Sequence, residues 1–269
     1  MSDERRLAGK WALILGASSG FGAACARALA AEGMNVFGVH LDLKSTLPRA
    51  KAVMADIEAA GGKAVFFNTN AADARKRARV LGKIEATLAD DVADRVHLML
   101  HSLAFGTLLP FIADEPEQAV SEAQMDMTSR VMAHCLVYWV QDLVRRDLVK
   151  KGSRIFSMTS GGSSRVVTNY GAVSAAKAAL ESHTRQLALE LAPRGIAVNA
   201  LMGGVTDTPA LRIIPGHQDI IKQALERNPG GRMTLAADVA SALVALADPR
   251  LTWITGAVIP VDGGEYIVG

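Results

Sequence analysis

The chain is poor in several features that would narrow its class at once. Its 269 residues include only 2 cysteines, Cys25 and Cys135, so we expect a reducing compartment and no disulfide framework. It has no apolar run of roughly 18 residues that would span a membrane, and its charged N-terminus does not resemble a signal peptide. The formal net charge is only +2, which favours neither nucleic acid nor a membrane surface as a partner. These absences predict a cytoplasmic protein.

Clusters of metal-ligating side chains are also missing from the sequence. His134 and His183 lie in helical patterns without a carboxylate or cysteine at ligand spacing, so no metal site is predicted. The basic run 75–79 is expected to be a solvated helix face. Apolar residues, in contrast, make up 50% of the chain against 21% charged, which suits a well-buried core of helices and strands.

Short apolar runs alternate with longer amphipathic runs along the whole chain, and no repeat or linker divides them. The predicted strands are residues 11–15, 35–39, 64–67, 96–100, 154–158, 197–201 and 257–261. The predicted helices are residues 22–32, 47–60, 75–89, 116–149, 172–191 and 237–246. This alternation predicts one α/β domain over residues 1–269, a doubly wound parallel sheet (Rossmann fold) with helices on both faces. Such folds bind ligands beyond the carboxyl ends of the strands.

A glycine-rich loop joins the first predicted strand to the first predicted helix. Gly16, Gly20 and Gly22 would let the backbone turn tightly and approach a pyrophosphate, while the N–H groups of the helix N-terminus face the anion. The strand–loop–helix context predicts a dinucleotide site. Ser18 and Ser19 are candidates to hydrogen-bond phosphate or ribose, with simple helix capping as the alternative.

Residues after the second strand give a mixed signal on the choice of cofactor. Asp42 would favour NAD(H), because a carboxylate accepts hydrogen bonds from the ribose hydroxyls. His40 and Lys44 would tolerate the additional phosphate of NADP(H), to which we give a slight preference. Asn70 and Ala71, after the third strand, are candidate adenine contacts or an ordinary loop.

Tyr170 and Lys177 lie seven residues apart in an Ala-rich helical run. Seven residues are close to two turns, so both side chains project from one face of the helix. An ammonium near a phenol favours the phenolate and lowers its pKa, which would give a proton donor usable near neutral pH. Such pairs are usually plain surface residues, but the glycine-rich loop upstream favours a catalytic role here.

With these motifs, the chain resembles the short-chain dehydrogenase/reductase family over nearly its whole length. It is most similar to the enoyl-acyl-carrier-protein reductase branch, which has Tyr-x6-Lys where most members have Tyr-x3-Lys. Val173 stands at the Tyr-x3-Lys position and has no hydroxyl. The segments His101-Ser102-Leu103-Ala104-Phe105-Gly106, Val198-Asn199-Ala200-Leu201-Met202-Gly203-Gly204 and Val261-Asp262-Gly263-Gly264 also resemble family motifs.

The resemblance implies a role for each of these positions. The backbone of Val205 and the side chain of Thr208 should hold the nicotinamide carboxamide, and Lys177 the nicotinamide ribose. His101 is expected to be a structural or ribose-side contact rather than a proton donor. Together with the loop residues, the expected cofactor contacts are Gly16, Ser18, Ser19, Gly20, Phe21, Gly22, His40, Asn70, Ala71, His101, Ser102, Lys177, Gly203, Val205 and Thr208.

In the reaction that the resemblance implies, NAD(P)H delivers a hydride to the β-carbon of an α,β-unsaturated acyl thioester. Tyr170 would donate a hydrogen bond to the thioester oxygen, where negative charge develops. Ser160 is a candidate for a second hydrogen bond, with a turn hydroxyl as the alternative, and Ser157 is a weaker candidate.

Residues 206–232 form an apolar stretch punctuated by Pro and Gly, which suggests a lid over a greasy substrate or, equally, a buried packing helix. Met127, Met132 and Met202 would line an adaptable acyl pocket or fill the core. By resemblance we also expect a homo-tetramer acting on a small-molecule or carrier-bound acyl thioester.

Two other functions stay open at this point. Retention of Ser160 keeps carbonyl reduction possible, so a carbonyl reductase or alcohol dehydrogenase acting on a ketoacyl, steroid or cyclic alcohol is the main alternative. A non-enzymatic dinucleotide sensor is the other, although no catalytic residue is missing.

Overall fold

The computed structural model describes residues 6–91, 93 and 95–268. Its centre is a 7-stranded sheet with the order β3-β2-β1-β4-β5-β6-β7, in which every pairing is parallel. The strands are β1 (Trp11–Leu15), β2 (Asn35–His40), β3 (Ala64–Asn68), β4 (Val96–His101), β5 (Arg154–Ser160), β6 (Ala197–Gly203) and β7 (Val258–Val261). The predicted doubly wound fold is confirmed.

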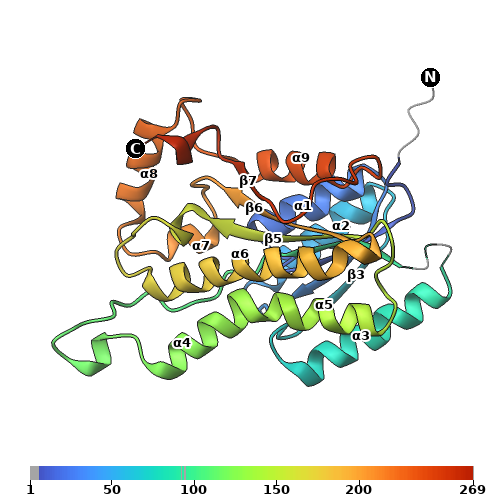
Figure 1. The fold of residues 1–269 in the computed structure, drawn as a ribbon, viewed down its shortest axis with the longest axis horizontal. Coiled ribbons are helices and arrows are strands. Elements are labelled where there is room, and N and C mark those ends of the chain that lie inside the picture. Colours follow the sequence, from blue (N-terminus) through green and yellow to red (C-terminus); the bar gives the residue numbers. More distant parts are fainter. Residues whose placement is uncertain (1–5, 92, 94, 269) are drawn as a thin grey trace.

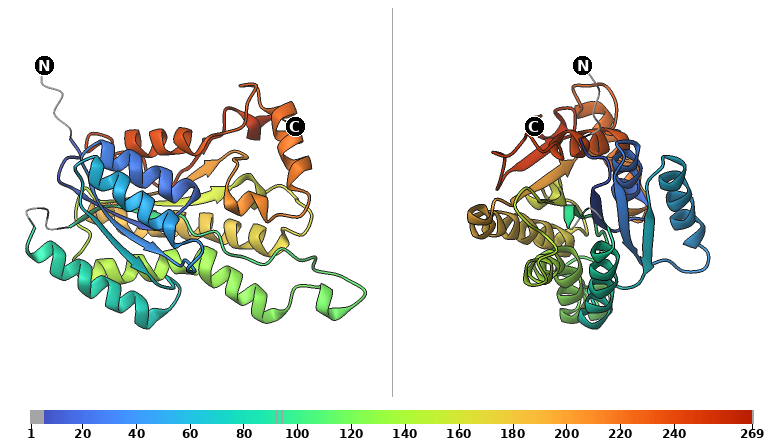
Figure 2. Two further views of the ribbon diagram at one scale, coloured as in Figure 1. Left: turned by 180° about the vertical axis from the view of Figure 1, so that it is seen from behind. Right: turned by 90° about the vertical axis from the view of Figure 1, so that its right-hand side faces the viewer.

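Helices cover both faces of this sheet (Figure 1 and Figure 2). One layer contains α1 (Gly20–Ala31), α2 (Leu47–Ala59) and α9 (Ala236–Leu246). The opposite layer contains α3 (Ala74–Ala89), α4 (Glu122–Ser129), α5 (Cys135–Arg145) and α6 (Gly171–Leu191). In the described part of the chain, no helix combines the length and the apolar character that a membrane crossing needs.

The strands are buried on both sides, which explains why they read as continuous apolar runs rather than alternating ones. Side chains of β1 alternate between two cores. Trp11, Leu13 and Leu15 join the core under α3, α5 and α6, whereas Ala12 and Ile14 join the core under α1 and α9. The two cores hold the sheet rigid and leave its carboxyl edge free to build a site.

The long helical stretch predicted over residues 116–149 is wrong as one element. A 3₁₀ turn (Pro116–Gln118) comes first, and α4 then starts at a capping box between Ser121 and Gln124. A π-helical turn at Arg130–His134 joins α4 to α5, which ends at Arg145. Asp147 takes a left-handed φ of 54° directly afterwards, so the helix cannot continue.

The basic run 75–79 is not a purely solvated face, contrary to the prediction. Arg77 on α3 is only 11% exposed, and its Nε donates to Asp142 of α5 at 2.7 Å. Its guanidinium also lies 5.7 Å from the ring of Tyr138. Because the sequence gives no sign that α3 and α5 pack together, this contact could not be read from the run itself.

We predict that Trp139→Phe destabilises the protein by about 1–3 kcal/mol. Trp139 is fully buried, and its Nε1 donates to the Ala71 carbonyl at 2.9 Å, so the substitution leaves that carbonyl only the weaker contact with the Cys135 Sγ at 3.4 Å. Urea unfolding measures the change. Trp253→Phe is the matched control, because Trp253 is 96% exposed and should shift the free energy of unfolding by less than about 0.5 kcal/mol. Equal effects of the two substitutions would contradict the prediction.

Candidate functional site

A cavity of about 1230 Å³ opens at the carboxyl edge of the sheet. It runs from the loop after β1 and the end of β2, past the ends of β4 and β5, to the segment that follows β6. Most of the predicted site residues line it, namely Gly16, Ser18, Ser19, Gly20, Phe21, His40, Asn70, Ala71, Ser102, Ser160, Tyr170, Lys177, Gly203, Val205 and Thr208. The fold therefore brings residues from five separate loops to one place.

The glycine-rich loop is shaped by close approaches between backbone segments. A Cβ on Gly16, which has a φ of 89°, would lie 2.3 Å from the Ser102 carbonyl oxygen. A Cβ on Gly22 would lie 2.1 Å from the Gly16 carbonyl oxygen. Only glycine fits at either position. The loop thus forms a cradle of bare backbone at the N-terminus of α1, which fits a pyrophosphate and hence the implied dinucleotide.

His40, at the end of β2, and Asp42 form a hydrogen-bonded pair beside this loop. The Nδ1 of His40 lies 2.8 Å from the Asp42 carboxylate, and both side chains are buried. Hydrogen bonds from Thr46, Ser18 and His40 hold the pKa of Asp42 below its ordinary value although burial opposes them. Asp42 is therefore ionised and fixed in place beside the loop.

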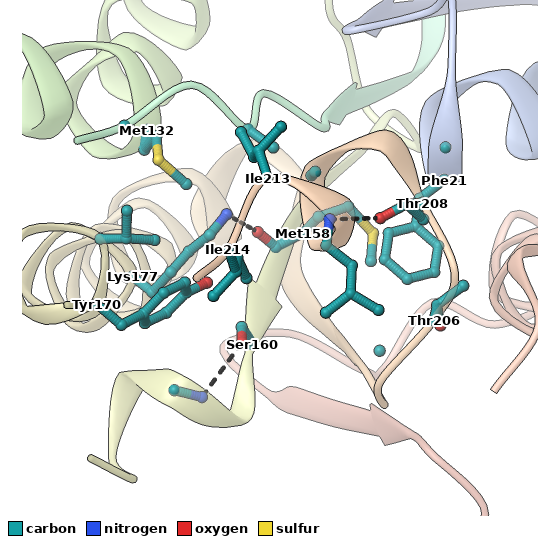
Figure 3. Close-up of a pocket in the computed structure, with 18 of the residues that line it drawn as sticks. Phe21, Met132, Met158, Ser160, Tyr170, Lys177, Thr206, Thr208, Ile213 and Ile214 are labelled. Atoms are coloured by element: carbon teal, nitrogen blue, oxygen red, sulfur yellow. Dashed lines mark hydrogen bonds between the residues drawn. The ribbon is translucent and has the colours of Figure 1, made fainter. Parts of the chain in front are cut away.

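Tyr170 and Lys177 both reach the cavity from α6, as the seven-residue spacing predicts (Figure 3). The ring of Tyr170 packs so closely on Gly162 that a Cβ there would lie 2.7 Å from the ring Cε1. Lys177 is 5% exposed, and its Nζ donates to the Met158 carbonyl at 2.6 Å. Ser160, at the end of β5, accepts from the Gly162 N–H at 3.2 Å.

The electrostatics of the pair differ from the prediction that a neighbouring lysine lowers the pKa of the tyrosine. Burial raises the pKa of the Tyr170 phenol, and a hydrogen bond with Ser160 only partly offsets this. Burial also lowers the pKa of Lys177 to about 8, against the attraction of Glu181 one turn further along α6. Tyr170 is consequently a protonated donor at neutral pH, and Lys177 is a cation close to its titration point.

Three predicted residues lie behind the cavity wall instead of lining it. Gly22 is covered by Gly16, as described above. His101 is fully buried, and this burial, together with the Lys177 charge, lowers its pKa to about 3. Ser157 pairs with Thr184 of α6 at 3.1 Å and is buried. A neutral, enclosed His101 suits a structural role.

The segment after β6 crosses the open side of the cavity. It contains α7 (Pro209–Arg212) and α8 (His217–Arg227), and its only buried side chains within these two helices are Leu211 and Ala224. The buried packing helix considered as an alternative is therefore wrong. The Thr208 Oγ1 caps α7 by accepting from the Leu211 N–H at 3.2 Å, and its own O–H can still donate (Figure 3). Met127, Met132 and Met202 also line the cavity.

Sequence reasoning missed the residues that the C-terminal tail, residues 262–268, brings to the cavity. Asp262, Glu265 and Tyr266 line it together with Arg165 from the loop after β5. The motif Asp262-Gly263-Gly264 signals a turn, but no local pattern indicates that the residues after it return to the site. Within the described residues, no group of three metal-ligating side chains is present.

Comparisons with known proteins agree with this geometry. A family model described as Enoyl-(Acyl carrier protein) reductase matches residues 16–265. The chain belongs to the short-chain dehydrogenase/reductase family. It is therefore an oxidoreductase of a family that uses NAD(P)H.

Relatives in this family differ in what they act on. The 2,5-dichloro-2,5-cyclohexadiene-1,4-diol dehydrogenase LinX of Sphingobium indicum is 31% identical over 261 residues, which cover 96% of this chain and 97% of that protein. The 3-oxoacyl-(acyl-carrier-protein) reductase FabG of Escherichia coli is 30% identical over 270 residues, covering 97% and 98%. The crystal structure of FabI from Candidatus Liberibacter asiaticus has a TM-score of 0.85 at 25% identity, covering 98% and 97%.

We predict that Gly162→Ala lowers kcat by about 10- to 100-fold, because the added methyl must push the Tyr170 ring out of position. Steady-state kinetics measures the loss, and thermal unfolding should change little. Gly82→Ala in α3 is the control, since a Cβ there meets nothing within 4 Å. An unchanged kcat in Gly162→Ala would show that catalysis does not depend on the packing of the Tyr170 ring against Gly162.

We also predict that kcat/KM falls as the pH rises through about 8. The Lys177 ammonium has a pKa of about 8 instead of 10.5, so its charge is present below that pH and is lost above it. A pH–rate profile measures this decrease in kcat/KM. Lys177→Arg keeps the charge and should flatten the profile at a lower overall rate. A wild-type profile that is level up to pH 10 would contradict the prediction.

Proposed function

We propose that the protein is an NAD(P)H-dependent reductase of α,β-unsaturated acyl thioesters, as in fatty acid synthesis. The observation that carries the proposal is the position of Tyr170 and Lys177 in one cavity at a spacing of seven residues. Val173, which stands at the spacing most family members use, is 4% exposed and has no hydroxyl. The catalytic phenol must therefore come from the first position of the motif.

The chain's own residues would provide the following chemistry. When bound, the dinucleotide would supply a hydride to the β-carbon, and negative charge would then develop on the thioester oxygen. The protonated Tyr170 donates a hydrogen bond to that oxygen, with Ser160 able to add a second. The Lys177 cation holds the nicotinamide ribose and keeps the local potential positive. The α-carbon would then take up a proton from solvent water, which completes the reduction.

The walls of the cavity support an acyl substrate. Phe105 and Phe111 in the loop after β4 are 66% and 53% exposed, and Ile213 after α7 is 65% exposed. Phe105, Ile213 and the methionines line the cavity, and the Phe111 ring packs against Gly171 at the start of α6. Apolar side chains that are this exposed at the mouth of a site favour an apolar ligand. The exposed segment with α7 and α8 would close over it as a lid.

For the cofactor, we favour NAD(H) over the slight preference for NADP(H) that the sequence suggests. The Nδ1 of His40 is engaged by Asp42, and the His40 side chain is only 4% exposed, so little of its ring can meet a phosphate. The ionised Asp42 beside Ser18 would repel a 2′-phosphate. The Lys and Arg residues that line the described part of the cavity are Arg165, Lys177 and Arg227, which come from the loop after β5, from α6 and from α8 instead of from the end of β2.

A second function, reduction of a carbonyl or oxidation of an alcohol, has specific support. Ser160 is close enough to Tyr170 to influence its pKa, an arrangement that suits a ketone oxygen as well as a thioester oxygen. LinX and FabG, by their names, act on a diol and a 3-oxoacyl group. A dinucleotide sensor is less favoured, because the catalytic side chains meet in one cavity.

A tetramer remains a prediction from the family resemblance. Leu189 on α6 is 71% exposed, and Trp253 and Leu251 on the loop before β7 are 96% and 40% exposed. Gly256 of this loop lies against Ala188 of α6, so the loop packs on this helix. A neighbouring subunit would shield them from water.

The decisive assay follows NADH and NADPH oxidation with crotonyl- and acetoacetyl-type thioesters. We expect turnover of the enoyl substrate with NADH, and a drop of about 100-fold or more in kcat for Tyr170→Phe. Tyr138→Phe is the control, because Tyr138 lies on α5 against Arg77 and away from the cavity. Turnover of the acetoacetyl thioester alone would favour carbonyl reduction. Cofactor binding without any turnover, and full cellular function of Tyr170→Phe, would favour a sensor.

A further inference from the structure

A buried carboxylate shapes the C-terminal tail where it turns back onto the site. Asp262 is 7% exposed, and it accepts from the Gly264 N–H at 2.9 Å and from the Tyr266 N–H at 2.8 Å. The Asn228 side chain donates to the Asp262 carbonyl at 2.8 Å. These bonds shape a 3₁₀ turn, η5 (Glu265–Ile267), which lies beside α8 (Figure 1 and Figure 2).

The tail is also tied to the loop that follows Ser160. The Arg165 guanidinium donates to the carbonyls of Tyr266 and Val268 and lies 4.8 Å from the Tyr266 ring. The Tyr266 hydroxyl is 2.7 Å from the Ser164 hydroxyl. With both sides held, the Glu265 side chain is directed into the cavity, where its Oε2 accepts from the Val205 N–H at 3.0 Å.

The negative charge of this carboxylate is unfavourable where it lies. Burial and the nearby Asp262 raise the pKa of Glu265, and the Val205 N–H, Arg165 and Arg227 oppose them. An acid whose pKa is raised in the folded state contributes less stability when it is ionised, so at neutral pH the charge of Glu265 works against folding. Charged groups that are kept despite such a cost concentrate at functional sites.

We propose that Glu265 is a gate on cofactor binding, which holds the Val205 N–H in the free enzyme and is displaced by the nicotinamide carboxamide. The inference rests on the proposed function, which assigns the carboxamide to this N–H. A backbone amide has one proton and serves one strong acceptor, so the carboxylate and the carboxamide oxygen compete for it. Arg165 and Arg227 are the cations that can take the carboxylate once it leaves.

Displacement links the two halves of the site. Glu265 belongs to the tail, whose Tyr266 and Val268 are tied to Ser164 and Arg165 in the loop after β5. Arrival of the nicotinamide would therefore release the tail from the end of β6, while its contacts with the serine loop persist. The lid helix α8, which carries Arg227, would receive the freed charge.

The test compares the dissociation constant of NADH for the wild-type enzyme, Glu265→Gln and Glu265→Ala by calorimetry or nucleotide fluorescence. We expect Glu265→Ala to bind NADH about tenfold more tightly, because the competing charged acceptor is gone. Glu265→Gln should lie between the two, since its neutral oxygen is a weaker acceptor, and its thermal midpoint should be equal to or above that of the wild type. Glu190→Gln is the control, because Glu190 is exposed on α6 and bonds only to Gln186 among the described residues.

Each outcome is informative. Unchanged or weaker NADH binding in both Glu265 variants overturns the gate, and a lowered thermal midpoint in Glu265→Gln assigns the carboxylate to folding instead. The isosteric glutamine variant keeps the test valid if the alanine variant fails to fold. If the wild-type enzyme binds neither NADH nor NADPH, the proposed function fails as well, whereas binding with an unaffected constant refutes the gate alone.

Discussion

The site depends on the burial of one ammonium group at the edge of the sheet. Lys177 is 5% exposed and is held by the Met158 carbonyl of β5. On the next turn of α6, Glu181 accepts from Thr159 of the same strand at 2.6 Å, which places a negative charge beside it. Burying an isolated charge costs a large amount of free energy. The helix α6 and the strand β5 must therefore stay in register if Lys177 is to remain a buried cation. The same register between α6 and β5 positions the Tyr170 ring against Gly162.

Much of the fold could be predicted from the sequence, because parallel strands buried on both faces appear as apolar runs between amphipathic helices. The strands β2 to β6 extend past their predicted ends by one or two residues, and in β2 to β5 these residues are polar, as at His40, His101 and Ser160. Apolar residues give way to polar residues where these strands reach the site. Apolar patterns therefore place a strand's middle better than its functional end.

The candidate site was predictable where one local motif carries the geometry, and not where distant segments meet. The glycine-rich loop and the Tyr–Lys pair are contained within single strand–loop–helix or helix segments, and both line the cavity. The tail carboxylate reaches Val205 from 60 residues away, and Arg77 reaches Asp142 from 65 residues away. Contacts of that range depend on packing, which no local spacing encodes.

The π-helical turn at Arg130–His134 lets the helix formed by α4 and α5 pack against two different surfaces. A π turn holds one residue more than an α turn, which rotates everything after it by about 100°. Before the turn, Thr128 faces the loop after β4 through the Thr107 N–H; after it, Trp139 faces the Ala71 carbonyl under the sheet. A regular helix of the same composition would keep its apolar stripe in phase with only one of these neighbours. The wider turn changes the direction in which the later side chains point, so the same helical segment lines the cavity with Met127 and Met132 and supports the loop at Ala71.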